Sequence, residues 1–139
     1  MSLPNPGILR VEISQLSAQR KELANYKEGL CKARDGLYVQ RAEILKEMLT
    51  LYKTLEDSSL PGNIKGQLQE RIALMQNAKI SLGSQIRSFQ DRISVIDKSG
   101  ENITSGITVR KDLLTRLIGS ISQQSKASQQ NRELGRIKG

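Results

Sequence analysis

Residues 9–51 read LRVEISQLSAQRKELANYKEGLCKARDGLYVQRAEILKEMLTL, and an aliphatic side chain returns at every seventh position of this stretch. Seven residues make nearly two turns of an α-helix, so the repeated side chains share one face. A face of this kind stays against a neighbouring helix when the two supercoil. The stretch therefore predicts a long helix packed lengthwise on another helix. The repeated residues are Leu9, Leu16, Leu23, Leu30, Leu37, Ile44 and Leu51.

The positions beside this repeat widen the predicted buried stripe, because a helix buries a band of side chains. Four positions after each repeated residue, the sequence is apolar at the two ends of the stretch and basic in the middle. One position after it, the residues are mostly small, aliphatic or aromatic. We therefore expect the stripe to lean toward this second set in the middle, with the basic side chains flanking it and laying their aliphatic stems along it. The basic residues are Arg20, Lys27, Arg34 and Arg41, and the second set is Ala24, Cys31, Tyr38, Leu45 and Tyr52.

Breaker residues divide the chain into segments. An N-terminal arm at 1–7 precedes a first helix at about 8–56, and a Pro-Gly turn at 57–62 leads to a second helix at about 63–97. Two heptad segments joined by so short a turn favour an antiparallel hairpin within 8–98 over pairing of the first helix with a second copy. The second helix contributes Leu68, Ile72, Met75, Leu82, Ile86, Phe89, Ile93 and Ile96 to the seam, interrupted by the one charged residue Lys79.

A second break is predicted at Ser99-Gly100-Glu101-Asn102, followed by a shorter third helix within 99–122. The Gln/Ser-rich basic tail at 123–139 is expected to be frayed or disordered in isolation. The predicted fold is thus all-α: a long antiparallel coiled-coil helical hairpin with a shorter third helix and a polar basic C-terminal tail.

This arrangement leaves the start of the first helix uncovered. A second helix that ends near residue 97 reaches back only to about residue 21 of the first. Leu9, Ile13 and Leu16 are therefore predicted to form an interface with a partner helix, by self-association or with a helical heteropartner in a large assembly.

The composition argues against catalysis. The chain has no His and one Cys, so it lacks the residues for His-containing triads, for zinc sites of His and Cys, and for an intrachain disulfide. The carboxylate pair Glu43 and Glu47 is expected to lie on a solvated face. We expect a non-enzymatic protein with no catalytic, cofactor or metal site and no small-molecule substrate.

The net charge of +8 is concentrated in residues 61–139, which hold thirteen basic and six acidic side chains. Such an excess suits an anionic partner. Binding to nucleic acid is expected to be weak, blind to sequence and salt-dependent, because few aromatic residues are present for base stacking. The candidate anion-binding residues are Arg110, Lys111, Arg116, Lys126, Arg132, Arg136 and Lys138.

The start of the chain has no basic region followed by an apolar run, so no signal peptide is predicted, and no stretch is long and apolar enough to be predicted as a membrane span. The expected location is the cytoplasm, or the inside of a virion or secretion assembly. Small helical subunits of bacterial secretion machines and phage particles have this general character, and a structural or adaptor subunit is the leading interpretation. The alternatives are an oligomer that binds nucleic-acid phosphates through the third helix and tail, and a chaperone whose seam shields a partner helix.

Overall fold

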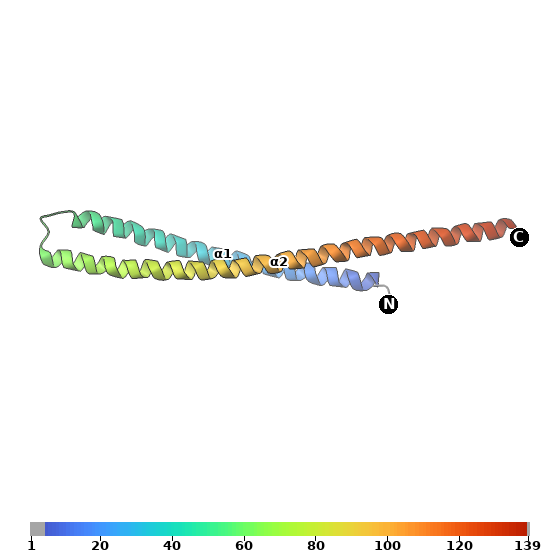
Figure 1. Cartoon of the computed structure of the whole chain (residues 1–139), viewed down its shortest axis with the longest axis horizontal. Coiled ribbons are helices and arrows are strands. Elements are labelled where there is room, and N and C mark those ends of the chain that lie inside the picture. The colour runs from blue at the N-terminus through green and yellow to red at the C-terminus, as the bar shows by residue number, and fades with distance from the viewer. Residues whose placement is uncertain (1–4, 139) are drawn as a thin grey trace. The chain divides into compact units, whose positions relative to one another are not determined.

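The computed structural model describes the backbone of residues 5–138 and the side chains of residues 5–124. Within this range the chain is all α-helical, with α1 at Pro6–Leu55 and α2 at Gly62–Lys138 (Figure 1). The helices pack together in two units. The turn unit comprises residues 25–97, and the terminal unit comprises the described residues of 1–24 and 98–139.

Local signals in the sequence set the start of α1. The Asn5 side-chain oxygen accepts a hydrogen bond from the Gly7 backbone N–H at 2.8 Å, and the Asn5 carbonyl accepts one from the Leu9 N–H at 3.0 Å. Asn is a favoured helix cap, and Pro6 follows it at a position where a missing N–H costs nothing.

The connection between the helices is held by its own hydrogen bonds. The Ser59 hydroxyl and backbone N–H donate to one Asp57 carboxylate oxygen at 2.6 and 3.0 Å. These two bonds lower the pKa of Asp57. The Pro61 carbonyl then accepts the N–H groups of Ile64 and Lys65, both at 3.1 Å, and so closes the first turn of α2.

In the turn unit the two helices run in opposite directions. Lys27 near the start of the α1 segment pairs with Asp97 at 2.6 Å, whereas the later residue Tyr38 contacts the earlier α2 residue Gln90 at 2.7 Å. The hydrogen bond and the charge of Asp97 raise the pKa of Lys27. The predicted intrachain seam residues are all buried or half-buried in the structure: Leu23, Leu30, Leu37, Ile44, Leu51, Leu68, Ile72, Met75, Leu82, Ile86, Phe89, Ile93 and Ile96.

The predicted lean of the α1 stripe is confirmed at Cys31 and Tyr38, which are half-buried, and wrong at Leu45 and Tyr52. Lys27, Arg34 and Arg41 are half-buried, whereas Leu45 and Tyr52 of the second set are exposed. The regular alternation of four- and three-residue steps keeps the basic positions on the packed face, where long aliphatic stems fill the space. The remaining residues of the two sets divide as follows: Cys31 and Tyr38 are half-buried, and Ala24 and Arg20 are exposed.

The predicted loop and third helix within 99–122 are also wrong, because α2 is continuous through this segment. Shielded positions continue at four- and three-residue steps, and Ile107 is only 3% exposed. A glycine inside a helix costs about 1 kcal/mol, which the burial of a single Ile or Leu outweighs. Residues 123–138, predicted as a disordered tail, also belong to α2, while their side chains from 125 onward lie outside the described residues. The shielded positions at these steps are Gly100, Ile103, Ile107, Arg110, Leu114 and Leu117.

The predicted free surface at the start of α1 is covered by the chain itself. In the terminal unit Leu9 is 5% exposed, and Ile13 and Leu16 are half-buried. Arg110 of α2 forms a hydrogen-bonded ion pair with Glu12 of α1. The premise behind the partner-helix interface was a second helix that ends near residue 97, and the longer α2 removes it.

The continuity of α2 predicts that alanine stabilises the helix at two glycines, by different amounts. A Cβ added at Gly100 meets no atom within 4 Å, so Gly100→Ala should raise the free energy of unfolding by about 1 kcal/mol. A Cβ added at Gly106 lies 3.2 Å from the Arg110 guanidinium, so Gly106→Ala should gain less. Urea unfolding followed by circular dichroism measures both. No effect at Gly100 would contradict an unbroken α2, and equal effects would contradict the close contact between Gly106 and Arg110.

The Asp57 contacts predict a pH-dependent contribution from the connection. A lowered pKa in the folded state stabilises the protein above the ordinary value of 3.8, and the gain disappears as the pH falls through the folded value. Asp57→Ala should therefore be less stable than wild type at neutral pH, and the difference should narrow below pH 3.8. Urea unfolding of both proteins across a pH series tests this expectation, which a pH-independent difference would refute.

Candidate functional site

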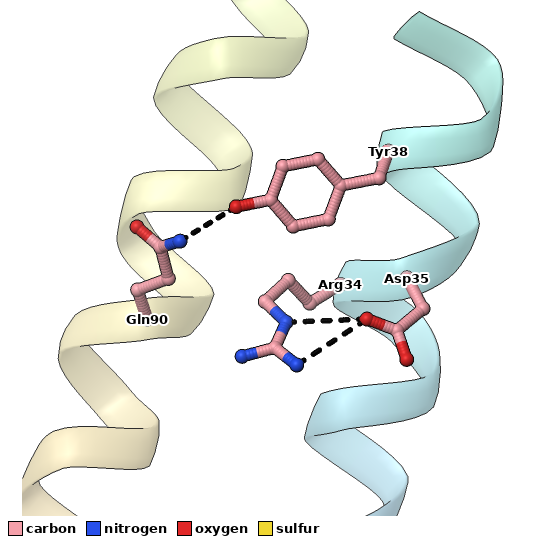
Figure 2. Close-up of polar contacts among 4 residues, drawn as sticks. All are labelled: Arg34, Asp35, Tyr38 and Gln90. Atoms are coloured by element: carbon pink, nitrogen blue, oxygen red, sulfur yellow. Dashed lines mark hydrogen bonds and ion pairs between the residues drawn. The ribbon is translucent and has the colours of Figure 1, made fainter. Parts of the chain in front are cut away.

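One face of the turn unit is defined by a contact between the helices. Gln90 Nε2 of α2 donates a hydrogen bond to the Tyr38 hydroxyl of α1, as Figure 2 shows. A step of seven residues along both antiparallel helices leads from this pair to Leu45 and Gly83, which therefore share its face. Leu45 thus stands in register with a residue that has no side chain.

An apolar stripe runs along α1 on this face. Leu45, Leu49 and Tyr52 recur at one-turn spacing and are 42%, 56% and 50% exposed. Tyr38 extends the same stripe and is half-buried. We call these four residues the apolar stripe. They lie beside the packed seam and remain open to solvent after the two helices have paired.

A basic hollow lies between the helices beside this stripe. It has a volume of about 330 Å³ and contains three cationic side chains. Gly83 helps to open it, because a Cβ there would meet no atom within 4 Å. The hollow is lined by Arg41, Lys79, Ile80, Gly83, Ser84 and Arg87.

The three cations of the hollow have no ion pair with a described residue, unlike two other cations on the packed face of α1. Lys27 pairs with Asp97, and Arg34 pairs with the adjacent Asp35 at 3.3 Å (Figure 2). Among the described side chains, no carboxylate lies within ion-pair distance of the cations in the hollow. Two of them are half-buried on the packed faces of their helices, where like charges repel more strongly than in water. The cations of the hollow are Arg41, Lys79 and Arg87, of which the first two are half-buried. Exposed cations elsewhere in the turn unit, such as Lys46 and Lys53, have no ion pair with a described side chain either.

Arg41 connects the hollow to the apolar stripe. Its guanidinium lies 5.0 Å from the centroid of the Tyr38 ring, within the range of a cation–π interaction. This contact holds the cation at the boundary between the two features. The face can therefore offer an anion-accepting hollow and an aliphatic surface to one ligand.

The predicted anion-binding residues with described side chains, Arg110, Lys111 and Arg116, are not gathered into such a site. Arg110 is half-buried and donates to Glu12 and to the Gly106 carbonyl, so a carboxylate of the chain already takes its charge. Lys111 and Arg116 are exposed. The remaining candidates fall outside the described side chains: Lys126, Arg132, Arg136 and Lys138.

Sequence reasoning missed the basic hollow, although two signals pointed toward it. Lys79 interrupts an otherwise apolar seam, and Arg41 is one of the basic residues that recur every seven positions in the first helix. The missing step was the pairing register, which places positions far apart in the chain beside one hollow. The exposed stripe was visible as the second set, but was expected in the seam.

The described part of the chain lacks the residue clusters of a metal site. No group of three or more potential metal-ligating side chains occurs there. Neither described helix contains a stretch that is long and apolar enough to cross a membrane. No protein family matches the sequence, and comparisons with curated proteins and with solved structures found no similar protein.

The unpaired cation on the seam of α2 predicts a stability gain on its removal. Lys79→Leu should raise the free energy of unfolding by about 1–2 kcal/mol, because it replaces a half-buried charge with an apolar side chain. Added salt should stabilise the wild type more than the variant, since salt screens the repulsion. Urea unfolding at low and high salt measures both effects. A less stable Lys79→Leu protein would show that the cation has a stabilising partner.

Proposed function

We propose that the protein is a coiled-coil hairpin that acts as a non-enzymatic structural or adaptor subunit in a multi-protein assembly, through helix–helix contacts. The coiled-coil interpretation is supported by shielded positions at four- and three-residue steps on both helices and by their antiparallel contacts. Cytoplasm and the inside of a virion or secretion assembly are the proposed locations.

The exposed apolar stripe is the observation that carries this proposal. The seam between α1 and α2 already buries the heptad residues, yet Leu45, Leu49 and Tyr52 add a second aliphatic and aromatic face with no intrachain need. A helix with two apolar faces is suited to contact two neighbours at once. Burial of such a stripe by a partner supplies a driving force for assembly.

The two alternative functions have weaker support. A chaperone that shields a partner helix in its seam would first have to separate α1 from α2, whose seam residues cover one another. Phosphate binding through the end of α2 is less favoured, because Arg110, one of its candidate residues, already forms an ion pair with Glu12. A partner bound on the outside of the helix pair requires neither change.

The double substitution Leu45→Glu with Leu49→Glu tests the proposal. Both side chains are exposed, so the variant should keep its helical circular dichroism and a cooperative unfolding transition. It should lose the stoichiometric partner that co-purifies with the wild-type chain from its native source. Solution mass and affinity purification of both proteins provide the measurement.

A matched control is available on α2. Leu74 is 70% exposed and does not belong to the apolar stripe, so Leu74→Glu should retain the partner. If the stripe variant retains the same partner at the same stoichiometry, the proposal is wrong. If only the Leu74→Glu control loses the partner, the interface lies on another face of the helix pair.

A further inference from the structure

We propose that the basic hollow and the apolar stripe together form a docking site for one acidic amphipathic α-helix of another protein. This inference rests on the proposed function and specifies the chemistry of the partner. A docked helix would place aliphatic side chains on the stripe and direct carboxylates of its flank toward Arg41, Lys79 and Arg87.

The positive charge of the hollow favours a negatively charged partner. Three cations line one space, and none of them has a carboxylate partner among the described residues. Carboxylates supplied from outside would relieve the repulsion between these cations and form charge-assisted hydrogen bonds.

The exposed apolar side chains beside the hollow favour a helical partner over a small free anion. Ile80 lines the hollow and is 61% exposed, opposite the stripe on α1, so the cations are bordered by aliphatic surface on both helices. The hollow holds about 330 Å³, which suits the ends of side chains, whereas an α-helix is about 10 Å wide. The body of a helical partner would therefore lie on the stripe and only its carboxylates would enter the hollow.

Two other occupants fit this face poorly. A second copy that used the same face would bring three cations against three cations. Nucleic acid could stack a base on Tyr52, but it would also cover the exposed aliphatic side chains Leu45, Leu49 and Ile80, which offer neither base stacking nor phosphate contacts. An acidic amphipathic helix matches both halves of the site.

The experiment measures binding of the full chain to a fluorescent synthetic peptide helix of about three heptads, with Leu along one stripe and Glu on both flanks. A second peptide carries the same Leu residues with Lys in place of Glu. We expect the acidic peptide to bind at least about tenfold more tightly than the basic peptide, and its affinity to fall with added salt.

A triple variant with Gln at the three cations of the hollow should lose at least about tenfold in affinity for the acidic peptide. Its matched control replaces Lys46, Lys53 and Lys98, which are exposed and lie outside the hollow, with Gln. The control has the same net charge as the triple variant, so it should bind like the wild type. Circular dichroism checks that both remain folded. The variant is Arg41→Gln with Lys79→Gln and Arg87→Gln.

The possible results separate this inference from the proposed function. Equal binding of both peptides, with loss on Leu45→Glu and Leu49→Glu, overturns the acidic partner and leaves helix docking intact. Absence of binding by either peptide overturns the inference, and retention of the native partner by the stripe variant overturns the proposed function. Displacement of the acidic peptide by a single-stranded oligonucleotide, or a doubled solution mass that depends on Leu45, also overturns the inference.

Discussion

Burial of one spaced stripe of side chains between antiparallel helices is the constraint on which each unit of this protein depends. A helix in isolation gains little from its own hydrogen bonds in water, so long helices need a packed face. Here that face consists of positions at alternating four- and three-residue steps on α1 and α2. The spacing is maintained even where the residue is a lysine, an arginine or a glycine, which shows that the position in the repeat decides which side chains are shielded.

Charged residues at seam positions lower the stability of the helix pair and give part of the seam a positive charge. Lys27 and Arg34 find carboxylates nearby, and their stems add apolar contact. Arg41 and Lys79 meet in a hollow where no described carboxylate reaches them. A core of Leu and Ile at these positions would hold the helices together more tightly. The charges at these positions are the basis of the proposed docking site.

Much of the helical pattern was predictable from the sequence, because heptad spacing is a local property. The ends of α1 and the start of α2 lie close to the predicted positions, since Asn5, Pro6 and Pro61 act on their immediate neighbours. The break near Gly100 was predicted wrongly because a cluster of small polar residues is also compatible with a helix when the flanking positions are buried. Ile103 and Ile107 supply that burial, which depends on contacts with α1 in the terminal unit.

The sequence by itself determined that the chain forms long helices with a heptad seam, because periodicity and turn residues act within a few positions along the chain. Tertiary structure decided which residues beside that seam are covered. It placed Lys27, Arg34 and Arg41 beside the seam residues, left Leu45 and Tyr52 in solvent, and covered Leu9 with α2. These outcomes depend on the register between α1 and α2, and register is a relation between distant segments that no local pattern contains.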